Sequence, residues 1–315
     1  GQRVFRQGGV RPPEQVSAFI DAHRKAFRVE PICKVLQTAS SAYYRFKARS
    51  SNPDLRSNRS KSDDQAMIQI RRVWDDSGQR YGVRKVWEQL KRDMVEIPRC
   101  RVERLMRKHQ MVGVRRDKGI ITTVRDPMVP CPTDLVKREF HAERPNQLWV
   151  SDFTYVSTWS GFVFVAFVVD VFARCIVGWK VSYSMRTDFV LDALEQALCA
   201  RKPKQEDGLI HHSDHGVQYL SIRYSSRLVE AGVEASTGTV GDSYDNALAE
   251  TINGLYKAEV IRRRSSWRNL EEVEWATLDW VDWFNNRRLF GPLGYRPPAE
   301  VEANYYANIG SATKA

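Results

Sequence analysis

Several patterns that would place a chain in a common class of protein are missing from these 315 residues. The longest apolar run, FVFVAFVV at 162–169, has eight residues, whereas a membrane-spanning helix needs roughly 20. The first ten residues, GQRVFRQGGV, contain no apolar signal core, so we expect no secretion. The five cysteines are odd in number and form no CxxC pair, which fits a reducing cytosol. These absences favour a cytoplasmic protein that does not cross a membrane.

Motifs of several common enzyme classes are also missing. The sequence has no Walker loop, no GxGxxG and no GxSxG. The first two would indicate phosphate or dinucleotide binding, and the third a serine hydrolase. Internal repeats and low-complexity segments are not evident either. Any catalytic function must therefore depend on other residue types.

Charge is distributed unevenly along the chain. Residues 1–150 contain 32 Lys and Arg against 17 Asp and Glu, whereas the remaining 165 residues contain 17 against 21. A strongly basic half joined to a mildly acidic half indicates a polyanion-binding arm and a separate second domain. The alternative is a basic surface that serves only solubility. Nucleic acid is the favoured partner, because the basic half also has helix-turn-helix patterning.

The basic half divides into helical units. Residues 1–50 predict short helices in a helix-turn-helix-like segment, and the Ser- and Asn-rich stretch 51–62 predicts a linker. Residues 63–112 predict a second helix-turn-helix-like, DNA-binding domain, followed by a basic connector at 113–145 with four prolines.

The last helix of the second unit, in IPRCRVERLMRKHQ, has a regular pattern. Val102, Leu105 and Met106 would face the core. The side chains expected to face outward and contact DNA are basic: Arg101, Arg104, Arg107 and Lys108. An ordinary three-helix bundle with a solvated basic face is the alternative.

From residue 147 the sequence predicts a catalytic core. QLWVSDFTYVST, GFVFVAFVVDVFA and CIVGWKVSYS are three consecutive strand-like runs rich in Val and aromatic residues. A helix, the short strand GLIHHSD, a second helix, a brief strand and a long helix from about 243 follow. This order predicts a mixed sheet flanked by helices. In the later helix, Trp280, Trp283 and Phe284 near one face predict packing rather than a stacking platform for bases.

Three acidic residues stand out in this half. Asp152 interrupts an apolar strand, where a carboxylate is costly unless it is paired or holds a metal. Asp214 ends the strand GLIHHSD, and Glu250 lies in the long helix. On that helix Asn246, Glu250, Asn253 and Lys257 fall at i, i+4, i+7 and i+11, so they form one polar stripe. A solvated helix face is the alternative for the stripe.

The chemistry of three carboxylates indicates magnesium. Hard divalent cations prefer oxygen ligands. Two such ions can activate a water or a 3′-hydroxyl at a phosphodiester and stabilise the leaving oxygen. The stretch IHHSDHG at 210–216 offers a zinc site as an alternative. Adjacent strand residues point to opposite faces, however, so His212 and Asp214 would share one face while His211 and Ser213 take the other.

Five blocks of sequence, taken in order, resemble one family. WVSDFTYV, HHSDHGVQY and SYDNALAETINGLYK are similar to the three catalytic blocks of DDE transposases with a retroviral-integrase-like core. Asp214 and Glu250 are separated by 35 residues, the interval typical of that family. The tail FNNRRLFGPLGYRPPAEV and the upstream YGVRKVWEQL...RVERLMRKHQMVGVRR resemble the OrfB part of insertion-sequence-three (IS-three) transposases.

The resemblance implies a fold and a site. The fold is an α/β RNase H-like core with a mixed five-stranded sheet over 146–265, preceded by an all-α helix-turn-helix region and followed by a C-terminal helical extension over 266–315. Asp152, Asp214 and Glu250 match the triad that binds two Mg²⁺ ions, for which Mn²⁺ can substitute. Lys257 matches the basic position expected to touch DNA. The secondary candidates for the site are His212, Asp245, Asn246 and Asn253, while Asp170 is expected to be structural.

The resemblance also implies the reaction and the partners. Such enzymes nick the transposon end with water, and the freed 3′-hydroxyl then attacks another phosphodiester without a covalent enzyme intermediate. The expected partners are double-stranded DNA (terminal inverted repeats and target), further copies of the chain on DNA, and an upstream OrfA product fused to or paired with it. The expected location is the bacterial cytoplasm, at the nucleoid. A catalytically silent DNA-binding protein derived from a transposase and a zinc hydrolase are the alternatives.

Overall fold

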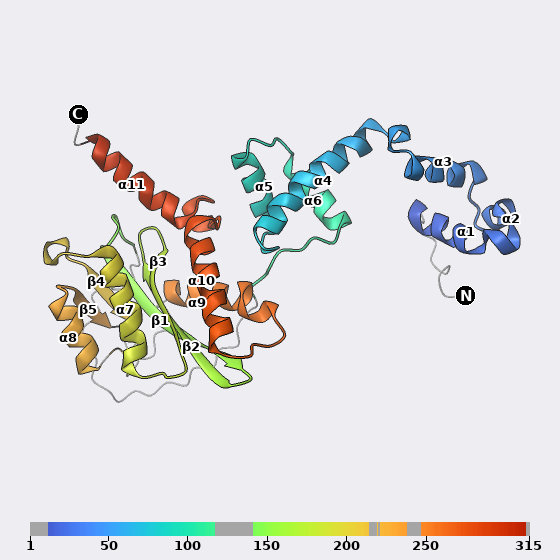
Figure 1. The fold of residues 1–315 in the computed structure, drawn as a ribbon. Coiled ribbons are helices and arrows are strands. Elements are labelled where there is room, and N and C mark those ends of the chain that lie inside the picture. The colour runs from blue at the N-terminus through green and yellow to red at the C-terminus, as the bar shows by residue number, and fades with distance from the viewer. Residues whose placement is uncertain (1–11, 117–140, 214–218, 220, 238–246, 313–315) are drawn as a thin grey trace. The chain divides into compact units, whose positions relative to one another are not determined.

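The computed structural model describes residues 12–116, 141–213, 219, 221–237 and 247–312. The chain divides into two compact units, residues 1–72 and 73–315, with distinct sets of internal contacts. Figure 1 labels the helices and strands used below. Each unit is described by itself.

The first unit is helical. It contains α1 (Pro13–Phe27), α2 (Val29–Val35), α3 (Ser40–Ser51), a 3₁₀ turn η1 (Pro53–Leu55) and most of α4 (Asn58–Asp76). Five buried residues form its core: Ile20, Ile32, Cys33, Leu36 and Tyr43. Helix α4 begins at Asn58, within the stretch expected to be a linker. Pro53 lies before the helix, and the polar residues after it carry no helix breaker, so composition alone placed the boundary too late.

The second unit starts with a pair of short helices after α4. Helix α5 (Val83–Arg92) packs against α6 (Arg99–Lys108), and Pro98 occupies the position before α6. Val102, Leu105 and Met106 of α6 are buried, as the sequence pattern predicts. The basic side chains of α6 lie on the remaining surface of the helix.

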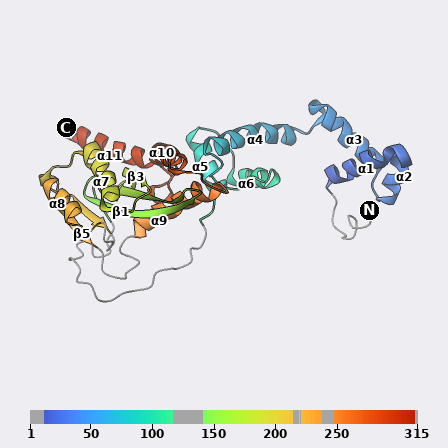
Figure 2. The same cartoon turned by 60° about the horizontal axis from the view of Figure 1, so that its bottom comes forward.

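A five-stranded sheet forms the centre of the second unit (Figure 2). Its strands are β1 (Leu148–Thr158), β2 (Gly161–Asp170), β3 (Cys175–Ser182), β4 (Ile210–Ser213) and β5 (Glu234–Thr237). The order across the sheet is β3-β2-β1-β4-β5, with β1, β2 and β3 antiparallel and β1, β4 and β5 parallel. The predicted mixed five-stranded sheet is confirmed.

Helices cover both faces of this sheet. Helices α7 (Thr187–Arg201) and α8 (Ile222–Glu230) pack on one face, where Phe153 of β1 meets Phe189 at a ring separation of 6.0 Å. Helices α9 (Ala247–Glu259) and α10 (Leu270–Asn286) pack on the other, where Phe167 of β2 contacts Tyr256 and Trp280. Trp280, Trp283 and Phe284 are buried, so the packing prediction for α10 holds.

Short turns and one more helix complete the unit. They are η2 (Gln205–Asp207), η3 (Ile261–Arg263), η4 (Gly291–Leu293) and α11 (Pro298–Ala312). Among the described residues, no helix is both long enough and apolar enough to cross a membrane.

A buried ion pair anchors the end of α9. Glu259 accepts hydrogen bonds from Arg288 Nη2 at 2.7 Å and from Trp280 Nε1 at 3.1 Å. The Glu259 and Arg288 side chains are only 7% and 3% exposed. Burial raises the pKa of Glu259, but the charge and hydrogen bonds of Arg288 more than offset this and hold it below its ordinary value. The helix is thereby fixed to the segment that follows α10.

Asp170, at the end of β2, has a structural environment. Its carboxylate is fully buried and accepts from the backbone N–H of Asn146 at 2.7 Å and of Phe172 at 2.9 Å. Burial raises the pKa of Asp170 to about 6, against the opposing effect of these two donors. Asp170 therefore fastens the chain that enters β1 to the turn after β2.

Candidate active site

The polar groups of the candidate site begin on β1 just after its described pairing with β4. The described pairing of β1 with β4 runs from Leu148–Ile210 to Ser151–Ser213. Asp152 is the next residue on β1 and lies opposite Phe167 of β2, the residue that contacts α9 and α10. Its side chain therefore points to the face of the sheet that α9 covers.

Asp152 is bound directly to helix α9. Its Oδ2 accepts from Asn253 Nδ2 at 2.8 Å, and its Oδ1 accepts from the N–H of Phe153 at 2.8 Å. Because an ionised carboxylate can only accept, the Asn253 amide must present its nitrogen here. Asn253 is 7% exposed, and its Oδ1 is buried without a hydrogen-bond partner. The pair leaves one buried acceptor beside the carboxylate.

Lys257 lies one turn further along the same helix. Its Nζ is 5.2 Å from the centre of the Tyr155 ring, a cation–π distance. Burial lowers the pKa of Lys257, the charge of Arg262 lowers it further, and Asp152 opposes both. A phosphate would relieve the repulsion between the two cations.

Glu250 lies in the first turn of α9 with an exposed side chain. A carboxylate at a helix N-terminus is favourable because the positive end of the helix dipole lies there. Of the predicted stripe, the structure brings Asn253 and Lys257 to Asp152. Asp214, Asp245 and Asn246 lie outside the described residues.

The two histidines of the described part of IHHSDHG lie on opposite faces of β4. His211 shares hydrogen bonds with Ser151 Oγ at 2.7 Å and Tyr224 OH at 3.1 Å, on the α8 side. Burial lowers the pKa of His211 to about 3, so the ring is neutral. His212 shares a 2.9 Å hydrogen bond between its Nδ1 and Ser236 Oγ of β5.

These contacts do not support zinc. Within the part of the chain that the structure describes, no three His, Cys, Asp or Glu side chains are grouped to hold a metal ion. His211 is fully used in the core. His212 is buried on the other face, the face of Val150, with which it is paired across β1 and β4.

Arg116 is a neighbour of α9 that sequence reasoning missed. A Cβ placed on Gly254 would lie 2.8 Å from Arg116 Nε and 3.0 Å from its Cζ. The guanidinium therefore occupies the space that a larger residue would fill, four positions after Glu250. The glycine inside a helical pattern was the available signal, because such glycines often mark a close approach.

The surface of α6 carries the predicted basic residues. Arg104, Arg107 and Lys108 are exposed, and Arg101 is half-buried. Arg107 forms an ion pair with Glu103 at 2.8 Å, one turn earlier on the helix. Such an exposed pair stabilises the helix by only about 0.3–0.5 kcal/mol, so it does not prevent Arg107 from contacting another anion.

Three family models match the chain. Residues 142–243 and 231–298 match two models described as "Integrase core domain", and residues 61–119 match an "HTH-like domain". The two integrase-core ranges include Asp152, Asp214 and Glu250. The range of the HTH-like model includes all of α6.

Two solved structures match the chain at low identity and with TM-scores below 0.5. A simian T-cell lymphotropic virus intasome chain matches with a TM-score of 0.45 at 14% identity, over 56% of this chain and 60% of that one. The catalytic core domain of HTLV-2 integrase, in complex with magnesium, matches with a TM-score of 0.42 at 16% identity, over 51% and 99%.

Relatives in sequence are much closer. The chain is 56% identical to the transposase of insertion element IS629 from Shigella sonnei, over 93% of this chain and 97% of that protein. It is 55% identical to a putative transposase of IS986/IS6110 from Mycobacterium tuberculosis, over 72% and 83%. It is 29% identical to transposase InsF of IS3A from Escherichia coli, over 77% and 83%. The chain therefore belongs to the IS3 (insertion-sequence-three) family of transposases.

Proposed function

We propose that this transposase cuts one DNA strand at each end of its element and joins the freed 3′-hydroxyl to a second DNA. The observation that carries the proposal is the contact between Asp152 and Asn253, with Lys257 beside it. It joins a carboxylate in an apolar strand to the helix that carries Glu250. Such a costly arrangement is expected at a site rather than on a plain surface.

In this proposal Asp152, Asp214 and Glu250 form the carboxylate triad. Asp214 directly follows the last described residue of β4, and β4 pairs with β1 just before Asp152. Asp245, Asn246 and His212 are proposed to border the site. Residues 63–112 would recognise DNA, and residues 146–265 would carry the chemistry.

The donor set suits magnesium. The triad offers carboxylate oxygens, which hard cations prefer, and the buried Asn253 Oδ1 can accept from a water that such an ion carries. When bound, two Mg²⁺ ions, or Mn²⁺ in their place, would supply the activation of the attacking oxygen and the stabilisation of the leaving oxygen.

The chain's own residues hold and orient the groups. Asn253 donates to Oδ2 of Asp152 and so fixes the orientation of this carboxylate. The carboxylate oxygens of Asp152 would then face a metal ion in one direction. Lys257, held over Tyr155, would contact a phosphate next to the cut. Arg116, seated on Gly254, would contact a second phosphate from the Glu250 side of the helix.

DNA recognition is proposed for α6. Arg101, Arg104, Arg107 and Lys108 would face the double-stranded terminal inverted repeats, and target DNA would approach the core. The chain would act at the bacterial nucleoid, as several copies on paired ends, with an OrfA product fused or bound. These partners rest on family membership.

Two measurements test the proposal. The full chain, incubated with a terminal inverted-repeat duplex and Mg²⁺ or Mn²⁺, should nick the 3′ end and join it to a target duplex. No nicking or joining with either metal, despite tight binding, would contradict it. Arg104→Ala should reduce the slope of log affinity against log salt by about one. An unchanged slope would mean that Arg104 does not contact a phosphate.

A further inference from the structure

Large aromatic side chains gather, exposed, at the outer end of the sheet. Tyr155 and Trp159, at the end of β1 and in the turn after it, are 60% and 72% exposed. Phe162 at the start of β2 is 58% exposed, and Tyr183 just after β3 is 50% exposed. We refer to these four residues as the aromatic strip. Exposed aromatic side chains that lie close together, unlike singly scattered ones, are candidates for a binding surface.

Contacts hold the aromatic strip in place. The rings of Tyr155 and Phe162 lie edge to face at 5.6 Å. The backbone N–H of Trp159 donates to the carbonyl of Trp267 at 2.9 Å, and Tyr183 OH accepts from the N–H of Leu270 at 3.1 Å. The strip is thereby fastened to the loop between α9 and α10, which lies beside the β1–β2 hairpin in Figure 1. These contacts hold the Tyr155, Phe162 and Tyr183 rings and the backbone of Trp159.

Two cations lie on aromatic rings in this region, one of them on the strip itself. Lys257 lies over Tyr155, and the guanidinium of Arg264 lies 4.6 Å from the centre of the Trp267 ring. Arg262 is close enough to Lys257 to lower its pKa. Lys257 and Arg262 are close to one another here, and Lys257 and Arg264 lie next to aromatic faces. An anion with flat apolar groups fits both features.

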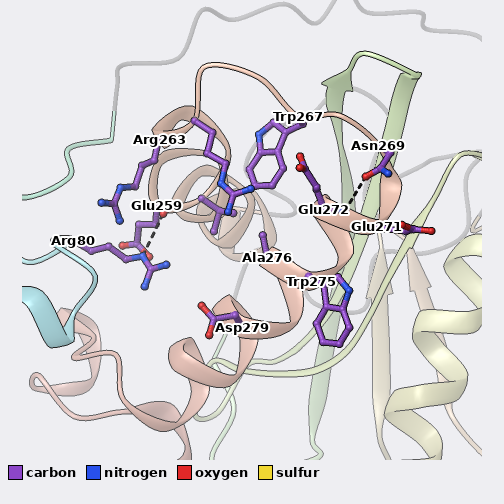
Figure 3. Close-up of a pocket in the computed structure, with 12 residues that line it drawn as sticks. Arg80, Glu259, Arg263, Trp267, Asn269, Glu271, Glu272, Trp275, Ala276 and Asp279 are labelled. Carbon is purple, nitrogen blue, oxygen red and sulfur yellow. Dashed lines mark hydrogen bonds between the residues drawn. The ribbon is translucent and has the colours of Figure 1, made fainter.

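A pocket of mixed charge lies beside Trp267 (Figure 3). Its volume is about 720 Å³, and Arg80, Arg263, Arg264 and Trp267 line one side. Glu259 lies among these arginines, and Glu271, Glu272 and Asp279 line another part of the wall. Because four carboxylates balance three arginines here, the pocket is not itself an anion site, and only Arg264, next to Trp267, is assigned a phosphate contact.

The strip lies close to the candidate active site. Tyr155 is three residues beyond Asp152 on the same strand, about 10 Å along it. Successive strand residues point to opposite faces, so the link between the two is Lys257, which lies over the Tyr155 ring. Burial lowers the pKa of Lys257, and the charge of Asp152 opposes that shift. A DNA strand at Asp152 that follows Lys257 would be led to the Tyr155 ring.

We infer that the aromatic strip stacks unpaired bases of the transposon end, while Lys257 and Arg264 contact the phosphates of the same strand. Every base has a flat face that can stack on an aromatic ring, and cations follow the backbone. A paired duplex hides its base faces, so the strip acts on a strand that has separated at the end. The inference rests on the proposed function, because it assigns the strand to the DNA end being cut.

A rescue experiment on the full chain tests this. The double variant Trp159→Ala/Phe162→Ala removes two rings that contact no proposed catalytic group. Two substrates are compared: a fully paired inverted-repeat end and the same end with its last three base pairs mismatched. The variant should join the paired end at least tenfold more slowly than the wild type, but join the mismatched end within threefold of it. Its affinity for a single-stranded oligonucleotide, measured by fluorescence anisotropy, should fall at least tenfold.

Tyr306→Ala is the matched control, since Tyr306 is 50% exposed on α11. It should leave both substrates and single-strand binding unchanged. An equal loss on both ends, or no loss on either, would overturn the inference. The inference would also be overturned if sedimentation velocity showed that the only effect of the double variant is to convert a dimer into monomers, because the strip would then bind a second copy of the chain. If the wild type joins neither end, the proposed function fails instead. The affinity for the single-stranded oligonucleotide then still decides whether the strip binds unpaired bases.

Discussion

Replacing Asn253 with leucine separates the orientation of Asp152 from the stability of the fold. The change keeps a similar side-chain volume but removes the Nδ2 donor, which lies 2.8 Å from Asp152 Oδ2. It also removes the buried Oδ1 that has no partner. A hydrogen bond to a charged group contributes about 1.5–3 kcal/mol, and an unsatisfied buried acceptor costs about 1–3 kcal/mol. The two terms nearly cancel, so the free energy of unfolding should change by less than about 1 kcal/mol.

Activity should respond quite differently. If this hydrogen bond stabilises the transition state by about 1.5–3 kcal/mol more than the ground state, its loss lowers the joining rate by roughly 10- to 150-fold, since 1.36 kcal/mol is tenfold in rate. We also expect a weaker response of the melting temperature to added Mg²⁺, because a freely rotating carboxylate is a poorer ligand. The assays are strand joining on an inverted-repeat end, urea unfolding, and thermal melting against Mg²⁺ concentration.

The control is Thr251→Val on the same helix. The Thr251 hydroxyl donates only to the carbonyl of Ala247, one turn earlier, so joining should stay within twofold of wild type. Joining by Asn253→Leu within twofold of wild type, with the same Mg²⁺ dependence, would show that Asn253 does not orient Asp152.

Three further changes test the surroundings of the site. Glu259→Gln should lower the free energy of unfolding, measured in urea, by about 3–5 kcal/mol, because Arg288 is left buried without its ion-pair partner. The double variant Glu259→Met/Arg288→Met should recover most of the lost stability. No recovery in the double variant would contradict the role of the ion pair. The pKa of Asp170 rises from 3.8 to about 6 on folding, so the folded state favours the protonated form of this carboxyl. The free energy of unfolding should therefore fall by up to about 3 kcal/mol as the pH rises from 4 to 6. Asp170→Asn should flatten this pH dependence, and an equally steep dependence in the variant would refute the assignment. Gly254→Ala should displace the Arg116 guanidinium and so lower the affinity for DNA, measured by fluorescence anisotropy. The free energy of unfolding should stay the same or rise by about 1 kcal/mol. Unaltered DNA affinity in both Gly254→Ala and Arg116→Ala would exclude a DNA contact by Arg116.

Local pattern predicted the fold well. The Val- and Phe-rich runs gave the antiparallel strands, and the alternating helices and short strands gave the parallel ones. Residues Val102, Leu105 and Met106 were correctly expected in the core, because their spacing follows the helical period. The start of α4 was missed, since polar composition resembles a linker and no local signal distinguishes the two.

Contacts between distant segments could not be predicted. Glu259 and Arg288 are ordinary surface residues by type, and only the packing of α9 against α10 buries them together. The helical stripe identified Asn253, but its bond to Asp152 spans 101 positions. Nothing in the local sequence shows that Tyr155 and Trp159 are exposed, because aromatic residues in strands are usually packed.

The triad itself is the central claim, and one assay tests it most directly. Asp152→Asn, Asp214→Asn and Glu250→Gln would be compared with the wild-type chain for nicking and joining an inverted-repeat end, in Mg²⁺ and in Mn²⁺. Affinity for the same DNA would be measured in parallel. We predict that each variant loses both reactions with either metal while its affinity stays within about threefold of wild type, since neutralising a carboxylate removes a metal ligand but no phosphate contact. Near-normal joining by any one of the three would contradict the assignment.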